Sequence, residues 1–288
     1  MCRDPEIDAV FVGTPNQLHV PVALEAVRNG KHVLVTKPLA DREEAAAELV
    51  QTAEAAGVVN MMSLNHRFSE SSLYLQAQAR AGVFGEIYYA RARSVRRNGI
   101  PAWNLGFIQE GGGAFRDMGV HMLDNSWAIM GRPKPVSVSG VCGAKFGPFG
   151  RGYSDPTPEE TWRQYAADDY AGGLIRFENG AALQVESFWA SNQPPEIQIE
   201  IFGDKAGAQA FPPIIYSTED GVEKDLAVRL STRGEKAWEN VAAHFIECVL
   251  DGAPCQSPLR DGLKVQQMLE AMLRSGALKR EVAIEDKY

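Results

Sequence analysis

The first 63 residues alternate between short apolar runs and segments with helical periodicity. A continuous apolar run at residues 9–12 predicts a parallel strand covered on both faces, and apolar residues then recur at helical spacing up to Gly30. A second strand is predicted at 32–35, a helix from Asp41 to Ala56 with a capping box at its start, and a third strand from Val58 towards Leu64. This βαβαβ order is one mononucleotide half of a doubly wound sheet.

The hydrophobic pattern changes after Arg67. An amphipathic helix is predicted up to Gly82, and a second one at 117–130. Asn179-Gly180 is a hairpin signal between two alternating runs, and the Gly- and Pro-rich segment 145–165 predicts a long surface loop. The predicted strands of this region are 87–95, 136–141, 170–177, 181–190 and 197–202.

These patterns predict an α/β plus α+β protein, in which a partial Rossmann doubly wound sheet is followed by a mostly antiparallel, open-faced sheet domain. The expected domains are residues 1–65 and 66–288, the second ending in amphipathic helices at 238–250 and 263–273. A chain of 288 residues is long enough for two hydrophobic cores.

Charge and cysteine usage narrow the class of protein. The net charge of −8, from 29 basic and 37 acidic residues, argues against nucleic acid and anionic membranes as partners. The near-alternation of Arg91, Arg93, Arg96 and Arg97 predicts the solvated face of a strand. The four cysteines are widely scattered and no secretory signal or long apolar run occurs, so we expect no metal or disulfide framework and a cytoplasmic location.

Two groups of residues are candidates for chemistry. Lys37 comes just after a predicted parallel strand, at the edge where open α/β sheets bind ligands, although a lysine at a strand end can also be an ordinary surface residue. Asp117 and His121 are four residues apart on a predicted helix and so point to one side. A histidine suits proton exchange near neutrality, and the preceding Gly111-Gly112-Gly113 permits close approach of a ligand; the alternative is a core histidine.

Several motifs together resemble the Gfo/Idh/MocA oxidoreductases. They are Asp8 to His19, Gly30 to Ala40, Gly111 to Asp124, Asp251-Gly-Ala-Pro and Asp261-Gly-Leu, in the family's order and across essentially the whole chain. The resemblance implies an NAD(P)-dependent oxidoreductase, with NAD or NADP as cofactor and a small-molecule polyol or sugar as substrate. The reaction would oxidise or reduce a hydroxyl or carbonyl group of a sugar, inositol or related molecule.

The resemblance also implies site residues. Thr14, Pro15, Asn16 and His19 would line the nicotinamide side of the cofactor, although Pro15-Asn16 can also be a simple turn into a helix. Lys37 would serve both cofactor and substrate, and Arg67 would lie near the site or instead form a domain-linking ion pair. His121 would accept the hydroxyl proton, in one network with Lys37 and Asp117.

Two departures from the family pattern raise alternatives. Thr36-Lys37-Pro38 replaces Glu-Lys-Pro, and the Gly-x-Gly-x-x-Gly loop that binds the pyrophosphate would lie before Met1, so an N-terminally truncated chain is expected. Residues 8–12 would then form an exposed, association-prone sheet edge. One alternative is a non-redox sugar-binding or regulatory protein that has lost the cofactor half, and another is a cofactor-independent lyase or epimerase.

The resemblance further implies a homodimer or homotetramer, assembled through the open face of the second sheet. Some apolar residues of the two strands at 181–190 and 197–202 are expected on that face. These residues are Val185, Phe188, Trp189, Ile197, Ile199 and Ile201.

Overall fold

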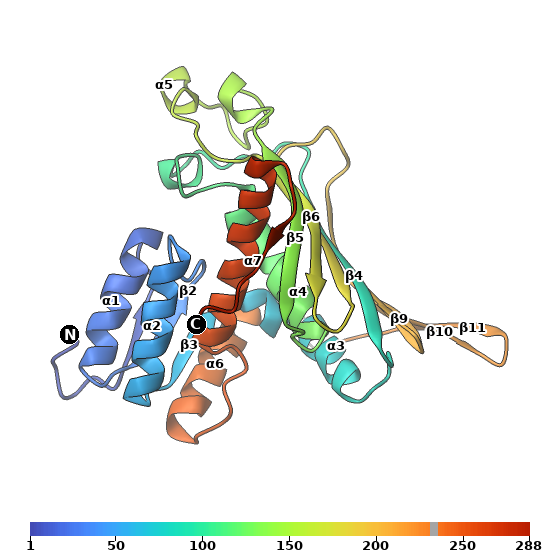
Figure 1. Ribbon diagram of the computed structural model, residues 1–288, viewed down its shortest axis with the longest axis horizontal. Coiled ribbons are helices and arrows are strands. Elements are labelled where there is room, and N and C mark those ends of the chain that lie inside the picture. Colours follow the sequence, from blue (N-terminus) through green and yellow to red (C-terminus); the bar gives the residue numbers. More distant parts are fainter. Residues whose placement is uncertain (231–235) are drawn as a thin grey trace. The chain divides into compact units, whose positions relative to one another are not determined.

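The computed structural model describes residues 1–230 and 236–288 and divides into two compact units (Figure 1). The first unit contains Met1–Ser69, Lys236–Glu270 and Asp286–Tyr288, and the second contains Glu70–Glu235 and Ala271–Glu285. The expected domain boundary at residue 65 lies close to the first crossing between the units. The expected ranges did not include the later return of the chain, at Lys236, to the N-terminal unit.

The first unit is built on a parallel three-stranded sheet in the order β1-β2-β3. Its five successive elements confirm the predicted βαβαβ half of a Rossmann sheet, and Val33 and Val35 of the central strand are fully buried. The elements are β1 (Ala9–Val12), α1 (Asn16–Arg28), β2 (His32–Thr36), α2 (Glu43–Ala56) and β3 (Asn60–Ser63).

The ends of α2 show which local signals were reliable. Gly57 closes the helix in the left-handed conformation, as predicted. The predicted start at Asp41 was wrong, because α2 begins at Glu43 after Arg42, and among the described residues no side chain caps its first turn. Glu43 and Glu44 lie there instead, where their charges interact favourably with the helix dipole.

The C-terminal helices complete the first unit. Helix α6 (Ala237–Leu250) packs against the 3-10 helix η1 (Asn65–Phe68), and Leu34, Met61, Phe68, Val241 and Phe245 form one apolar cluster. Helix α7 (Leu259–Leu278) begins here and continues into the second unit. In the described part of the chain β1 pairs with β2 alone, and 60% of Phe11 is exposed on this edge strand.

The second unit is a nine-stranded sheet in the order β11-β10-β9-β8-β4-β7-β6-β5-β12. Adjacent strands are antiparallel except for β4 and β7, which confirms a mostly antiparallel sheet, and Asn179-Gly180 forms the β6–β7 hairpin. The strands are β4 (Ile87–Val95), β5 (Pro135–Gly143), β6 (Tyr170–Phe177), β7 (Ala182–Phe188), β8 (Glu196–Gly203), β9 (Ala206–Ala210), β10 (Pro213–Glu219), β11 (Val222–Ala227) and β12 (Val282–Ala283).

Helices cover one face of this sheet, which we call the inner face. A π-helix η3 (Phe115–Gly119) continues into α4 (Val120–Ile129), and both pack on β4 and β7. The C-terminal part of α7 approaches β5 and β6 closely, because Gly140 and Gly173 leave room for Met272. The remaining helices are α3 (Glu70–Arg80), η2 (Leu105–Phe107), η4 (Gly147–Phe149) and α5 (Glu159–Trp162). None of the described helices is long and apolar enough to span a bilayer.

The opposite face, here called the open face, is not the apolar patch that the sequence led us to expect. Val185, Trp189, Ile199 and Ile201 are buried, because strand alternation turns their side chains away from it. Phe188 is partly buried, and Ile197 is exposed. The open face instead carries charged and aromatic side chains from the alternate positions, with Arg91 and Arg93 in ion pairs with glutamates of β8.

Candidate active site

The turn between β1 and α1 brings three predicted site residues together at the carboxyl end of a parallel strand. Thr14 is partly buried, Pro15 is exposed as the N-cap residue of α1, and Asn16 begins the helix. The Thr14 hydroxyl is buried and has no hydrogen-bond partner among the residues that the structure describes. A buried hydroxyl without a partner beside a helix N-terminus is suited to a polar or anionic ligand.

His19 is fully buried and contacts backbone rather than open space. Its Nε2 lies 2.7 Å from the carbonyl oxygen of Thr14, and its Nδ1 lies 2.7 Å from the carbonyl oxygen of Pro38. The imidazole therefore joins the β1–α1 turn to the turn that follows β2. His19 therefore positions the turn that carries Lys37.

Lys37 directly follows β2, is partly buried, and precedes Pro38 through a cis peptide bond. Its charge acts on His66 of η1. Burial lowers the pKa of His66 below its ordinary value, and the positive charge of Lys37 lowers it further. A neutral imidazole thus accompanies Lys37, a relationship that the sequence did not indicate.

Arg67 is held inside the first unit. Only 1% of it is exposed, and its Nη1 donates to Oδ2 of Asp261 at 2.6 Å and to the carbonyl oxygen of Gln256 at 2.7 Å. These contacts give a structural reason for the Asp261-Gly motif at the start of α7. Arg67 thus forms an ion pair, as the alternative expected, but both partners lie in the first unit, so this pair does not link two domains.

In the second unit, Asp117 lies within the π-helix η3. The Val120 amide donates to the carbonyl oxygen of Phe115, five residues back, and such wide turns are frequent at functional sites. Asp117 Oδ2 accepts a hydrogen bond of 3.1 Å from the indole Nε1 of Trp189, which is fully buried at the end of β7. The indole thereby fixes the orientation of the carboxylate.

His121 lies on the first turn of α4 and is partly buried. Met118 and Met122, close to it in sequence, are buried. The three glycines before η3 have a different role from the one expected. A side chain at Gly112 would collide with the carbonyl oxygen of Phe107, and one at Gly113, where φ is +115°, would collide with Asp168. The close approach that Gly112 and Gly113 permit is therefore to the protein itself, whereas a side chain at Gly111 would meet nothing within 4 Å.

Asp168 is a site residue that sequence reasoning missed. Its Oδ2 accepts a 3.0 Å hydrogen bond from the amide of Phe115, so it is anchored beside the π-helix of Asp117. Burial raises the pKa of Asp168 to about 6, against lowering effects from the Phe115 amide and Arg116. The double carboxylate Asp168-Asp169 after a loop rich in glycine was the only sequence signal that pointed to it.

Aromatic rings extend from Asp117 to the surface of the second unit. The ring of Phe107 lies 6.5 Å from that of Trp189, and Trp103 lies 4.8 Å from Phe107, both edge to face. Trp103 is 76% exposed. A carboxylate followed by aromatic rings provides a hydrogen-bond acceptor and an apolar platform, the two features that a sugar ring needs.

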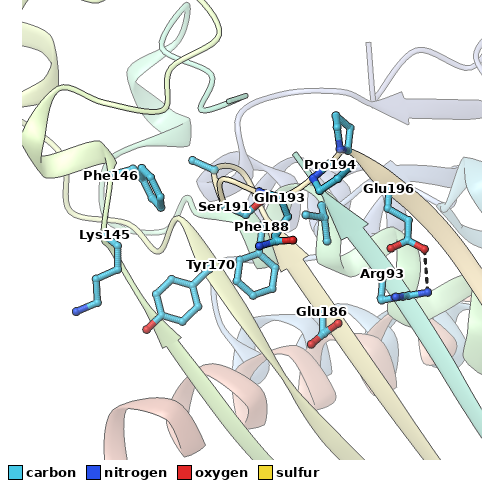
Figure 2. Close-up of a pocket in the computed structure, with 13 residues that line it drawn as sticks. Arg93, Lys145, Phe146, Tyr170, Glu186, Phe188, Ser191, Gln193, Pro194 and Glu196 are labelled. Carbon is cyan, nitrogen blue, oxygen red and sulfur yellow. Dashed lines mark hydrogen bonds and ion pairs between the residues drawn. The ribbon is translucent and has the colours of Figure 1, made fainter. Parts of the chain in front are cut away.

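A hollow of the second unit lies at a different place, on the open face. Its volume is about 680 Å³, and Figure 2 shows Tyr170 and Phe188 side by side, with Arg93 bonded to Glu196. The two rings are stacked at 5.6 Å. Phe188, the last residue of β7, lines this hollow, whereas neither Asp117 nor Trp189 is among its lining residues.

Comparison with known families covers most of the chain. Residues 1–64 match the model of an oxidoreductase family with an NAD-binding Rossmann fold, and residues 73–209 match the GFO/IDH/MocA C-terminal domain. D-glucoside 3-dehydrogenase of Escherichia coli (strain K12) is 33% identical over 93% of this chain and 77% of its own length. The chain therefore belongs to the Gfo/Idh/MocA family of oxidoreductases, as its motifs suggested.

Other relatives agree with this assignment. The scyllo-inositol 2-dehydrogenase (NAD(+)) of Bacillus subtilis (strain 168) is 28% identical over 87% of this chain and 70% of its own length. A solved levoglucosan dehydrogenase, in complex with NADH and levoglucosan, has the same fold with a TM-score of 0.82 and 21% identity, over 99% of this chain and 82% of that one. This last likeness confirms the predicted fold class.

Proposed function

We propose that the protein is an NAD- or NADP-dependent oxidoreductase that interconverts a secondary hydroxyl and a carbonyl on a sugar, inositol or related polyol. The observation that carries this proposal is the Asp117 carboxylate, oriented by Trp189 within a π-helix and continued to the surface by aromatic rings. A pyranoside or cyclitol can stack its C–H face on such rings while its hydroxyls bond to the carboxylate. The names of the E. coli and B. subtilis relatives support the same substrate class.

Part of a dinucleotide site is supported by the β1–α1 turn. The Thr14 hydroxyl has an unused hydrogen-bonding capacity, and Pro15 and Asn16 present the positive end of α1. When bound, the nicotinamide supplies the hydride acceptor or donor. Thr14, Pro15 and Asn16 would hold its side of the cofactor, and His19 would keep that turn in place.

The remaining roles concern the substrate hydroxyl and its proton. His121 takes the proton as the carbinol is oxidised and returns it in the reverse reaction. Asp117 orients the imidazole or binds a second hydroxyl. Lys37 donates a hydrogen bond to the reacting oxygen, and the neutral His66 beside it does not compete with it as a cation.

The proposal is tested by substrate-dependent nucleotide reduction. Glucosides, inositols and anhydro-sugars are offered with NAD or NADP while absorbance of the reduced nicotinamide is followed, and binding of each nucleotide is measured separately by thermal shift. We expect reduction with at least one cyclic polyol and stabilisation by the nucleotide that supports it. Stabilisation by sugars with no effect of either nucleotide would contradict the proposal and favour a non-redox sugar-binding protein.

A second measurement separates the lyase or epimerase alternative. Exchange at carbon next to a carbonyl takes up deuterium from solvent without any nucleotide, whereas hydride transfer moves hydrogen between substrate and cofactor. Incubation of the substrates in D2O without nucleotide, followed by mass spectrometry, should leave their mass unchanged. Deuterium uptake that disappears in the His121→Asn variant would instead establish proton-transfer chemistry alone.

A further inference from the structure

A second chemical cluster lies in the first unit and consists of residues not assigned above. The ligand atoms of His244, Cys248 and Cys255 all lie within 4.8 Å of one another. His244 and Cys248 are buried, and Cys255 is partly buried. Imidazole nitrogen and thiolate sulfur are the donors that Zn²⁺ and similar borderline-soft divalent ions prefer. We propose that these three side chains bind one such ion, leaving a fourth position open to water or a small ligand.

The backbone fixes the three donors before any ion arrives. His244 and Cys248 are four residues apart on α6, so their side chains lie on one face, with Nε2 and Sγ 3.4 Å apart. The chain then turns through Gly252, where φ is +68°, and returns past Cys255. The returning segment is tied to β3 by the Ser257 hydroxyl and by the Met62 amide, each bonded to the other residue's carbonyl oxygen.

The ring nitrogen of His244 that faces Cys248 is the unprotonated one, as a metal ligand must be. Its Nε2 accepts a 2.9 Å hydrogen bond from the amide of Gln256, and since an amide only donates, the lone pair must be on Nε2. The proton is then on Nδ1, which lies 3.6 Å from a carboxylate oxygen of Glu247. Metal-binding histidines commonly have this arrangement, in which a carboxylate faces the other ring nitrogen and raises the basicity of the ligand atom. The ring of Phe68 packs on the imidazole at 5.5 Å.

The Cys248 thiol lies 3.4 Å from Nε2 of His244. The two thiols are also hydrogen-bonded to each other, and Cys255 donates weakly to the carbonyl oxygen of Asn60 at 3.8 Å. An incoming ion must therefore displace the Gln256 hydrogen bond at Nε2 and take the place of these contacts between the thiols.

The chain offers matched controls for this proposal. Cys248→Ser and Cys255→Ser each remove one soft donor, whereas Cys2→Ser and Cys142→Ser remove thiols outside the cluster. Glu247→Gln keeps all three donors and removes only the carboxylate facing Nδ1, at a residue whose side chain is 60% exposed. None of these residues belongs to the machinery proposed for the redox reaction, so loss of metal binding and loss of dehydrogenase activity can be told apart.

The test uses the whole chain, freed of metal with a chelator under reducing conditions and then titrated with Co²⁺. We expect one equivalent to give an intense near-ultraviolet sulfur-to-cobalt charge-transfer band and tetrahedral visible bands, both abolished by Zn²⁺. Cys248→Ser and Cys255→Ser should each lower Co²⁺ affinity by more than about 100-fold, and Glu247→Gln by about 10-fold. Cys2→Ser and Cys142→Ser should leave it unchanged.

Three results would overturn the site. The first is a wild-type titration without the charge-transfer band, and this result decides even where a serine variant fails to fold. The second is equal Co²⁺ affinity in the wild type and both serine variants. The third is a protein that binds no ion after reduction yet, on exposure to hydrogen peroxide, loses two hydrogens in intact mass and, by thiol labelling and peptide mapping, the free thiols of Cys248 and Cys255 while those of Cys2 and Cys142 remain. That result would identify Cys248 and Cys255 as a thiol pair oxidised to a disulfide by peroxide, which is reduced to water.

Discussion

The Nδ1 atom of the buried His19 ring lies 2.7 Å from the carbonyl oxygen of Pro38. The other ring nitrogen is equally close to the carbonyl oxygen of Thr14. One imidazole thus connects the turn that begins α1 with the turn that carries Lys37. The placement of these two predicted site segments therefore depends on His19, whose own side chain is fully buried.

Replacing His19 should disturb both turns together. We expect His19→Ala to lower the free energy of unfolding by about 2–4 kcal/mol, because it removes a buried ring that contacts two carbonyl oxygens and opens a cavity. Nucleotide affinity should fall as well. Urea unfolding and thermal shift with nucleotide measure the two effects, and Gln17→Ala on the exposed side of α1 is the control. An unchanged unfolding midpoint would show that the two contacts contribute nothing.

Trp189 should act on turnover through Asp117. Trp189→Phe keeps an aromatic ring in the core but removes the indole N–H, and a hydrogen bond to a charged group contributes about 1.5–3 kcal/mol. If that energy orients the carboxylate in the transition state, kcat should fall about 10- to 100-fold with little change in nucleotide affinity. Steady-state kinetics measure this. Trp162→Phe serves as the control, and an equal loss there would mean that Asp117 is not the residue affected.

The sequence predicted helices and strands better than it predicted contacts between residues far apart in the chain. Strands 87–95 and 170–177 have the bounds that the alternation predicted. Strands β9 and β11 were missed because β9 consists of alanines, one glycine and one glutamine, and every residue of β11 is exposed, so neither shows a hydrophobic pattern. A strand that is exposed on both faces has no alternation of buried and exposed residues, so its sequence shows no hydrophobic pattern.

The same limit applies to the candidate site. Motifs singled out Lys37, Asp117 and His121, but not the side chains that hold or tune them. Trp189 is 72 positions from Asp117, and Asp261 is 194 positions from Arg67. The cluster of His244, Cys248 and Cys255 lacks a standard zinc spacing, because one ligand returns through a turn after α6. Such contacts follow from the tertiary fold and leave no local periodicity.

The residues proposed for proton transfer can be tested directly. We expect His121→Asn and Lys37→Ala each to reduce kcat by about 10²- to 10⁴-fold, the usual contribution of a positioned acid or base. Neither change should alter the elution volume on a sizing column. Stopped-flow measurement of nucleotide reduction gives the rates, and His32→Asn is a control at a histidine outside the proposed site. Turnover close to that of the wild type in both variants would refute the assignment.

Asp168 should make stability depend on pH. Its pKa is raised from 3.8 to about 6 on folding, so the folded state holds the proton more tightly than the unfolded chain does. This contribution is fully present below pH 3.8 and is lost as the pH rises through about 6. Asp168→Asn stays neutral and can still accept from the Phe115 amide. Its free energy of unfolding at pH 7 should exceed that of the wild type by no more than about 3 kcal/mol.

Denaturant unfolding between pH 4 and pH 7 checks this expectation. The difference between Asp168→Asn and the wild type should grow as the pH rises through about 6 and then become constant. The exposed Asp155→Asn serves as the control and should show no such growth. A difference that shrinks with rising pH would have the wrong sign and would mean that Asp168 is stabilised as a carboxylate.

The sequence also led us to expect self-association through the open face. The structure changes which residues should be substituted to test it. The face carries the stacked rings of Tyr170 and Phe188 beside the ion pair of Arg93 and Glu196, not an aliphatic patch (Figure 2). We expect a homodimer or homotetramer, in which partner chains bury these rings and desolvate the charges. Phe188→Glu should lower the assembly state seen by light scattering, whereas Tyr216→Glu, on β10 and outside the hollow, should not. A wild-type chain that is monomeric at all concentrations tested would refute this expectation while leaving the proposed chemistry intact.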